Sequence, residues 1–330
     1  MKSGAKKSKP NRSLDSPSAS AQGLSIVGAG RLGTALGIAL SKAGYDVQAV
    51  ITKNPATARR AAKMIGQKSL AFSVDQLNSI RSRQAESLVR SSLILIATPD
   101  DVINSVAWKI AAFFEQKSNF SYSIAGRTAL HTSGALSSTE LRPLGRLGFA
   151  TGSLHPLISI SDARSGSLMF RDSFFCVEGD KTARKEAALI AEALEGKTFN
   201  IKGDSKALYH AAAVMAAGNV IALFDIAIKM LQRCGLSARR SQEVLLPLLK
   251  SSAANLETMN PPDALTGPFS RGDVATVRKH LAAIKAQGLD SALSVYAALG
   301  NHSLSLARGK AKRPANFSEL SRLVSGQHRT

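Results

Sequence analysis

A glycine-rich turn between an apolar run and a helical pattern constrains this chain more than any other feature. The turn follows the apolar residues 24–27, and a helical pattern continues from it to about residue 43. Its residues are Gly28, Ala29, Gly30, Arg31, Leu32 and Gly33. In a strand–turn–helix unit, the first glycine of G-x-G-x-x-G permits a tight turn and the second lets the backbone approach a diphosphate. The third lets the helix pack against the strand, and the free amides at the helix N-terminus face the anion. The pattern predicts a dinucleotide site, and a glycine-rich turn without a ligand is the alternative.

Short apolar runs alternate with helical patterns as far as about residue 203. Residues 93–98 read Leu-Ile-Leu-Ile-Ala-Thr, a continuous apolar run that is typical of a parallel strand covered on both faces. The alternation predicts an α/β fold, a doubly wound Rossmann sheet. After residue 203 the strand patterns stop, and the remaining segments have helical periodicity. We therefore expect an all-helical C-terminal domain.

Composition limits the compartment and the class of protein. The chain has 330 residues, of which 44% are hydrophobic, so it is long enough for two domains with buried cores. Two cysteines, Cys176 and Cys234, are too few for a disulfide framework or a structural zinc site, so we expect a cytoplasmic protein. The most apolar stretch, residues 208–231, contains ionisable side chains that a membrane span tolerates poorly. We expect a buried helix or a subunit interface there, and no membrane span.

The net charge of +20 is partly carried by the two ends of the chain. Residues 1–22 contain five Lys or Arg and one acid, and residues 308–330 contain six and one. Such charge is typical of nucleic-acid contacts or of solvated tails. No nucleic-acid motif accompanies it, so we expect a small anionic substrate and not a nucleic acid.

The end of the second predicted strand bears on the choice of nicotinamide cofactor. NAD-specific sheets place Asp or Glu there to hold the ribose 2′-hydroxyl. This chain has Thr52 and Lys53 at that point, followed by Arg59 and Arg60, and Asp46 lies at the opposite end of the strand. A cation in place of the acid favours a 2′-phosphate and hence NADP, although these cations are also typical of a solvated helix face.

Polar residues follow the later strands, at the edge of the sheet where ligands bind. Thr98 and Pro99 end the fourth strand and are expected to touch the cofactor. His131 and Ser133 end the fifth, with His131 as a candidate proton donor and Ser133 as a candidate to orient either His131 or the substrate. The alternative for both is a turn bonded to the backbone. His155 ends the sixth strand and is a candidate for binding substrate, and the alternative is a structural histidine beside a proline turn.

The long helix after residue 203 adds further candidates. Lys206 and His210 are four residues apart and therefore share one helix face, which suits a pocket wall; the alternative is an ordinary helix start. Arg271, in a Gly/Pro-rich loop, is a candidate for binding a substrate carboxylate through its planar guanidinium, and the alternative is an exposed loop arginine. No histidine or cysteine spacing suits a metal ligand set, so we expect no metal site.

Several short motifs occur in a specific order along residues 23–305. They are residues 28–33, 97–101 (Ala-Thr-Pro-Asp-Asp), 131–134 (His-Thr-Ser-Gly), 154–157 (Leu-His-Pro-Leu), 209–210 (Tyr-His), 266–268 (Thr-Gly-Pro) and 271–273 (Arg-Gly-Asp). Together they resemble a bacterial family described as NADP-dependent oxidoreductases, with a Rossmann-like domain followed by a helical domain of unknown function. More remotely, the layout is similar to pyrroline-5-carboxylate reductase, prephenate dehydrogenase and the β-hydroxyacid dehydrogenases. The resemblance implies a helical domain that closes the nicotinamide pocket and often dimerises. The β-hydroxyacid dehydrogenases also carry a catalytic lysine at the start of this helix, which implies a catalytic role for Lys206.

These observations predict four segments. They are a disordered basic leader at residues 1–22, a Rossmann-like NADP-binding domain at 23–203, a helical substrate and dimerisation domain at 204–307 and a basic tail at 308–330. The expected function is hydride transfer between NADP and a small carbonyl, imine or hydroxy-acid substrate, with His131, Ser133, Lys206 and His210 as catalytic candidates. The alternative is a non-catalytic dinucleotide-binding or redox-sensing module that acts through a protein partner.

Overall fold

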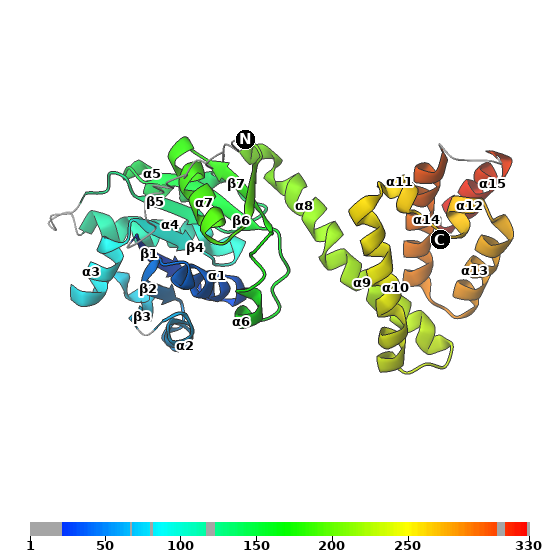
Figure 1. Ribbon diagram of the computed structural model, residues 1–330, viewed down its shortest axis with the longest axis horizontal. Coiled ribbons are helices and arrows are strands. Elements are labelled where there is room, and N and C mark those ends of the chain that lie inside the picture. The colour runs from blue at the N-terminus through cyan, green and yellow to red at the C-terminus, as the bar shows by residue number, and fades with distance from the viewer. Residues whose placement is uncertain (1–21, 67, 80–81, 117–122, 309–313, 329–330) are drawn as a thin grey trace, which may run out of the picture. The chain divides into compact units, whose positions relative to one another are not determined.

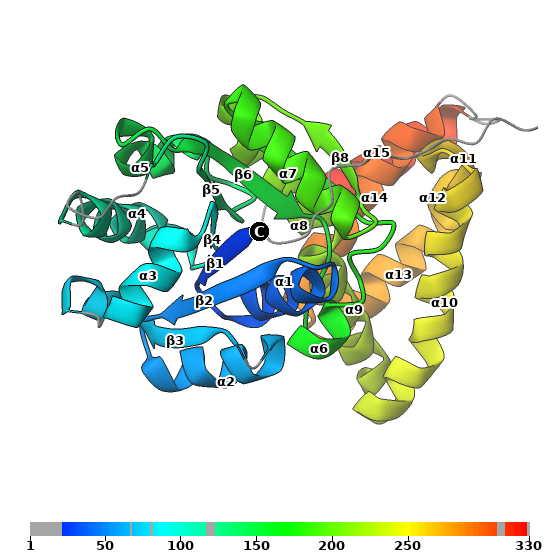
Figure 2. The same cartoon turned by 60° about the vertical axis from the view of Figure 1, so that its left-hand side comes forward.

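The computed structural model describes residues 22–66, 68–79, 82–116, 123–308 and 314–328 (Figures 1 and 2). The chain forms two compact units, Met1–Ala213 and Val214–Thr330. The division falls ten residues beyond the boundary expected at 203, so Lys206 and His210 are residues of the first unit. Apart from Gln22, the predicted leader lies outside the described residues.

The first unit contains one eight-stranded sheet (Figure 2). The strands are β1 Gly23–Val27, β2 Asp46–Thr52, β3 Leu70–Ser73, β4 Leu93–Ile96, β5 Thr128–His131, β6 Ala150–Pro156, β7 Phe174–Gly179 and β8 Lys197–Asn200. Their order is β3-β2-β1-β4-β5-β6-β7-β8. Strands β1 to β6 pair in parallel, β7 is antiparallel to β6, and β8 is parallel to β7. This confirms the predicted doubly wound sheet.

Helices supply the apolar partners of the sheet. Those that begin in the first unit are α1 Arg31–Lys42, α2 Pro55–Ile65, α3 Ser82–Arg90, α4 Asp100–Gln116, α5 Arg142–Arg146, α6 Ala163–Gly166, α7 Lys181–Ala193 and α8 Lys206–Ala216. Leu95 joins a core that includes residues of α1 and α7, whereas its neighbour Ile94 joins a second core with residues of α4. Successive side chains of a strand point to opposite faces, so both faces of β4 are covered and its sequence is apolar throughout.

The carboxyl ends of β1, β4, β5 and β6 meet at one edge of the sheet. Strand β1 lies between β2 and β4, so the strand order runs to one side of β1 through β2 and β3 and to the other side from β4 onward. In sheets of this kind, ligands bind in the crevice at the point where the strand order reverses. The glycine turn follows β1, residues 97–100 follow β4, and residues 132–134 follow β5. The sheet order therefore brings the sequence motifs to one place.

The second unit is helical in its described part, as the sequence predicted. Its helices are α9 Gly218–Arg233, α10 Ala238–Thr258, α11 Pro261–Ala264, α12 Pro268–Arg271, α13 Val274–Ala286, α14 Asp290–Ala307 and α15 Pro314–Ser325. Its core includes Val277 of α13 and Leu304 of α14. The one long helix expected over residues 205–233 is two helices, because Ala217 has a non-helical backbone (φ −122°, ψ −76°).

The structure corrects the description of residues 308–330 as a tail. Residues 314–325 form α15, and its side chains Phe317, Leu320 and Val324 are buried in the core of the second unit. Their spacing of three and four residues places them on one helix face. Counting only the charge of this segment concealed that apolar stripe. Four basic residues of the segment lie outside the described part, namely Lys310, Lys312, Arg313 and Arg329.

Candidate active site

A cavity of about 520 Å³ lies at the carboxyl edge of the sheet, within the first unit. It is lined by residues at or just after the carboxyl ends of four strands and by one residue of α8. They are Gly30, Arg31, Leu32, Ala97, Thr98, Pro99, Asp100, Thr132, Ser133, Gly134, His155, Pro156, Ile158, Ile160 and His210. Two of the predicted histidines and five of the predicted cofactor residues thus share one cavity wall; the five are Gly30, Arg31, Leu32, Thr98 and Pro99. The other predicted cofactor residues do not line this cavity; they are Gly28, Ala29, Gly33, Thr52 and Lys53.

The three glycines of the turn have different surroundings, as their predicted roles require. Gly28 has φ +95°, and a Cβ there would lie 2.6 Å from the backbone of Ala97 and Thr98. A Cβ on Gly33 would lie 2.0 Å from the carbonyl oxygen of Gly28, so this glycine permits the close packing of α1 on β1. At Gly30 a Cβ would meet no protein atom within 4 Å. The open side of the turn is therefore at Gly30, where a diphosphate would approach.

Two unpaired groups also suit a phosphate-bearing ligand. Helix α1 begins at this turn with no side chain capping its N-terminus, so its first amides keep their hydrogen-bonding capacity for a ligand. In the described part of the chain, Thr98 has a buried hydroxyl oxygen, Oγ1, without a hydrogen-bond partner. A buried polar atom of this kind normally has a partner. The turn, the helix N-terminus and Thr98 fit a dinucleotide.

The end of β2 presents a cation, as the sequence suggested. Thr52 donates its hydroxyl hydrogen to the carbonyl oxygen of Asn54 (2.6 Å), and the Asn54 side chain caps α2. Lys53 is exposed between them. The carboxylate of Asp75, beyond β3, is bonded to Lys109, which lowers the pKa of Asp75, with a smaller effect from Lys53. Residues 52–54, at the end of β2, include no Asp or Glu, and Asp75 of the neighbouring segment is bonded to Lys109, so Lys53 remains the candidate for a 2′-phosphate.

His131, the predicted proton donor, does not line the cavity. Its ring is fully buried; Nδ1 accepts a hydrogen bond from the Ser133 amide (3.2 Å), and Nε2 lies 3.0 Å from the Ser137 carbonyl oxygen. Burial, then the charge of Lys206, lowers its pKa to about 4. The imidazole is neutral at neutral pH and holds the turn after β5. These ring contacts are those of the backbone-bonded alternative, and a catalytic role for His131 stays a prediction.

Ser133 lines the cavity, but its hydroxyl is committed to the same turn. It donates to a carboxylate oxygen of Asp100 (2.9 Å) and accepts from the amides of Ala135 and Leu136. These bonds connect the turn after β5 to the first turn of α4. They do not orient His131 toward a substrate, so the predicted Ser133–His131 pair is not formed as expected.

Lys206 is fully buried and is not part of the cavity wall. Its ammonium donates to the Ser133 carbonyl oxygen (2.7 Å) and to the Ser153 hydroxyl (2.8 Å). Ser153 in turn donates to Glu178 (3.3 Å), which also accepts from the amide and hydroxyl of Ser138 (both 2.8 Å). Burial lowers the pKa of Lys206, and Cys176, Glu178 and Asp100 oppose that shift. The predicted shared face with His210 exists, but Lys206 lies beneath the cavity wall.

His155 and His210 are the ionisable rings that face the cavity. A Cβ on Gly134 would lie 2.4 Å from His210 Cδ2 and 2.9 Å from His155 Nε2, so both rings lie against this glycine. The two rings meet edge to face, with centroids 5.6 Å apart. Burial, followed by the charges of Lys206 and His210, lowers the pKa of His155 to about 4. His155, predicted to bind substrate, is therefore a neutral imidazole on the cavity wall.

Sequence reasoning missed Tyr209 and Glu178. The Tyr209 hydroxyl lies 2.7 Å from His155 Nδ1, and Glu178 balances the buried lysine through Ser153. Tyr209 stands beside His210 in one of the motifs, which was a usable signal. Glu178 carried no such signal, because only the pairing of β7 with β6 places it opposite Ser153.

Arg271 lies in the second unit, at the end of α12, and is exposed. Asp273 caps α13, with a bond from the Thr276 amide (3.0 Å). Arg271 therefore remains a prediction for substrate binding.

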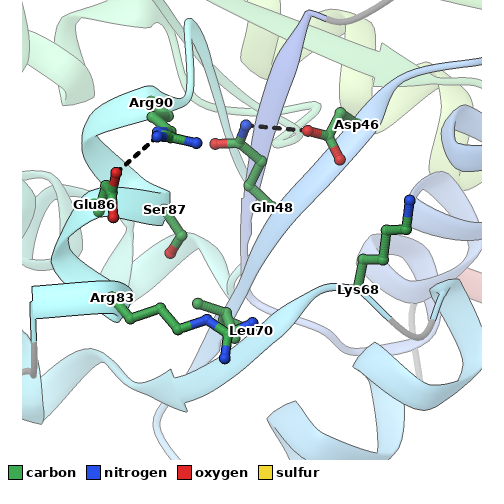
Figure 3. Close-up of a pocket in the computed structure, with 8 residues that line it drawn as sticks. All are labelled: Asp46, Gln48, Lys68, Leu70, Arg83, Glu86, Ser87 and Arg90. Atoms are coloured by element: carbon green, nitrogen blue, oxygen red, sulfur yellow. Dashed lines mark hydrogen bonds and ion pairs between the residues drawn. The ribbon is translucent and has the colours of Figure 1, made fainter.

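A second cavity, of about 250 Å³, lies at the opposite edge of the sheet (Figure 3). It is lined by Asp46, Gln48, Lys68, Leu70, Arg83, Glu86, Ser87 and Arg90. Arg90 pairs with Glu86 (2.7 Å) and Gln48 donates to Asp46 (3.1 Å), as the dashed lines show. Its wall has neither a histidine nor the glycine turn. The described residues contain no group of three or more His, Cys, Asp or Glu side chains that could hold a metal ion.

Comparison with known proteins gives two consecutive domain matches, and their junction lies before the division between the two units. Residues 8–156 match a Rossmann-like domain, and residues 173–303 match a domain of unknown function, DUF2520. No curated protein matches the sequence. Among solved structures, a protein of Thermotoga maritima has a TM-score of 0.63 at 24% identity, with 87% of this chain and 99% of that chain covered.

Two further structures are named for nicotinamide cofactors. A "putative NADP oxidoreductase" of Bacteroides fragilis has a TM-score of 0.62 at 19% identity, covering 88% of this chain and 98% of that one. An imine reductase of Myxococcus stipitatus, in complex with NADP⁺, has a TM-score of 0.55 at 14% identity, covering 87% and 93%. At these identities the likeness is one of fold. The two domain matches confirm what the motifs implied: a Rossmann-like domain is followed by a helical domain of the DUF2520 type.

Proposed function

We propose that this protein is an NADP-dependent oxidoreductase that acts on a small carbonyl, imine or hydroxy-acid substrate. The observation that carries the proposal is the continuity of the cavity: its wall runs from the open side of the glycine turn to His155 and His210. The structural neighbours named as NADP oxidoreductase and imine reductase support the same class.

The chain offers distinct groups for each part of the cofactor. Residues 28–33 and the N-terminus of α1 would hold the diphosphate. Thr98 and Pro99 would contact the nicotinamide side of the cofactor, and Lys53 would face the 2′-phosphate on its adenosine side. When bound, a nicotinamide dinucleotide supplies or accepts a hydride. The residues of the cavity wall beyond Pro99 would then determine which substrate atom exchanges a hydride with the cofactor.

His155 and His210 would hold the oxygen or nitrogen of the substrate. A neutral imidazole N–H donates to a carbonyl or imine lone pair and thereby draws electron density from the carbon. Ile158 and Ile160 add an apolar surface to the same wall, and Arg31 adds a cation. The net charge of +20 favours a small anionic substrate, whereas Arg31 belongs to the turn that would hold the diphosphate.

Cofactor preference is tested by titrating the protein with NADPH and with NADH while following nicotinamide fluorescence. We expect NADPH to bind at least tenfold more tightly, because the Lys53 ammonium attracts the 2′-phosphate. Lys53→Glu should remove that preference. Lys63→Glu, which makes the same charge change in the last turn of α2, is the matched control and should retain it.

The outcomes separate the alternatives. Equal binding of both cofactors by the wild-type protein would contradict the role of Lys53. Binding of neither would overturn the proposed function. Tight NADPH binding without turnover across carbonyl and imine panels would favour the non-catalytic redox-sensing module.

We also propose that the protein is a cytoplasmic homodimer that associates through α9 and α10. In the described residues, Gly203–Arg233 is the one helical stretch long and apolar enough to cross a membrane, by length and composition only. Its start belongs to the Rossmann unit, where Lys206 and Tyr209 are bonded to the sheet strands, so this part is not available to a bilayer. Ile221 and Leu248 are exposed on the second unit, as apolar residues of a subunit interface would be in one isolated copy.

Sedimentation equilibrium should therefore give twice the mass of the chain. Ile221→Glu is expected to give a monomer, because a buried carboxylate opposes association. Leu189→Glu, a similar change at an exposed position of α7, is the control and should remain dimeric. A monomeric wild-type protein that floats with phosphatidylcholine vesicles would contradict the dimer and favour a membrane contact.

A further inference from the structure

His155 and Tyr209 form a pair whose geometry bears on which ring nitrogen carries the hydrogen. The Tyr209 hydroxyl lies 2.7 Å from His155 Nδ1, and the rings meet edge to face at 5.7 Å. Across the antiparallel β6–β7 ladder, His155 lies directly opposite Cys176. The Cys176 thiol is buried and hydrogen-bonded to the same hydroxyl. Tyr209 therefore lies between a thiol and an imidazole nitrogen.

Only two proton arrangements satisfy these three groups. Burial raises the pKa of both the Tyr209 phenol and the Cys176 thiol, so each keeps its hydrogen. In the first arrangement the phenol donates to Nδ1 of His155 and accepts from the thiol. In the second, Nδ1 donates to the phenol, which donates to sulfur. A phenol donating to an imidazole nitrogen forms a strong bond, whereas sulfur is a weak acceptor, so the first arrangement is favoured.

The first arrangement leaves the hydrogen of His155 on Nε2, which lies against Gly134 on the cavity wall. The groups around His155 keep the ring neutral. The charged or ionisable side chains that act on its pKa are Lys206 and His210 of α8, and the neutral His131 of β5 also interacts with it. None of these side chains is a carboxylate. The ring thus offers the cavity a single uncharged N–H donor.

We propose that Tyr209 is a positioning residue that fixes His155 in the Nε2–H tautomer, so that the cavity receives a neutral N–H donor directed at a carbonyl or imine lone pair. The use of this donor on a substrate rests on the proposed function. The tautomer itself does not, because it follows from contacts inside the Rossmann unit.

Long-range ¹H–¹⁵N correlation spectra of the protein at pH 7 test this proposal without a cofactor. The His155 signals are identified by their loss in His155→Gln. We expect the wild-type ring to show hydrogen on Nε2 and a bare Nδ1. Tyr209→Phe, which removes the donor, should give a mixture of both tautomers.

The chain contains a matched control for this experiment. Tyr296 lies 2.8 Å from His280 Nδ1 in the second unit, so Tyr296→Phe removes an equivalent phenol and should leave the His155 signals unchanged. Hydrogen on Nδ1 in the wild-type protein would overturn the proposal, as would a pure Nε2–H tautomer in Tyr209→Phe. Dinucleotide binding is a separate readout: NADPH should bind Tyr209→Phe within twofold of wild type, and loss of binding in both proteins would instead refute the proposed function.

Discussion

Gly30→Ala is expected to weaken NADPH binding at least tenfold while the protein remains folded. A Cβ at this position meets no protein atom within 4 Å, and the backbone, with φ −70°, is accessible to any residue. Alanine is a poorer helix N-cap than glycine, but it also restricts the unfolded chain, so the free energy of unfolding should change by less than about 1 kcal/mol. The methyl group would occupy the space through which a diphosphate approaches the backbone.

Nicotinamide fluorescence measures the binding, and the fluorescence of Trp108, the one tryptophan of the chain, reports the unfolding of the first unit. Gly66→Ala is the control, because its Cβ would also meet little, the nearest atom being the Ser41 hydroxyl at 3.7 Å. It should bind NADPH as the wild type does. Unchanged binding by Gly30→Ala would show that the diphosphate does not lie on the glycine turn. Gly28 and Gly33 are unsuitable for this test, since a Cβ there collides with the protein itself.

The features predicted correctly from sequence are those that depend on local periodicity. The glycine turn after an apolar strand, the continuous apolar run of β4 and the change to helices after residue 203 are each visible within one short segment. The cavity wall at the ends of β1 and β4 follows from them, because parallel strands end at the same edge of a sheet.

The roles of the polar residues depend on how deeply each side chain is buried and on which strands, distant in the sequence, are paired. His131 and His155 both end strands, but the turn after β5 encloses His131 with two backbone contacts, whereas His155 reaches the cavity. Lys206 and His210 share a helix face as their spacing predicted, yet one is buried beneath the wall and the other is on it. Helical spacing gives a direction around the axis and no information about depth.

Lys206→Met is expected to lower the free energy of unfolding of the first unit by about 3 kcal/mol or more. Methionine has a similar length, so little packing is lost. The Ser133 carbonyl oxygen and the Ser153 hydroxyl would lose their donor, and Glu178, 8% exposed, would lose the balancing ammonium. Removing one member of a buried charge pair is costly because the other remains desolvated.

A double-mutant cycle with Glu178→Gln distinguishes this structural role from the catalytic role predicted for Lys206. If Lys206 balances Glu178 through Ser153, the double variant should be more stable than the sum of the two single losses predicts, since neither charge is then left alone. Urea unfolding, monitored by Trp108 fluorescence, gives the free energy of unfolding of each protein in the cycle. Arg90→Met, which breaks an exposed pair with Glu86 in α3 of the first unit, is the control and should change stability by less than about 1 kcal/mol. A Lys206→Met protein of unchanged stability that loses turnover of an identified substrate would instead support direct participation of Lys206 in catalysis.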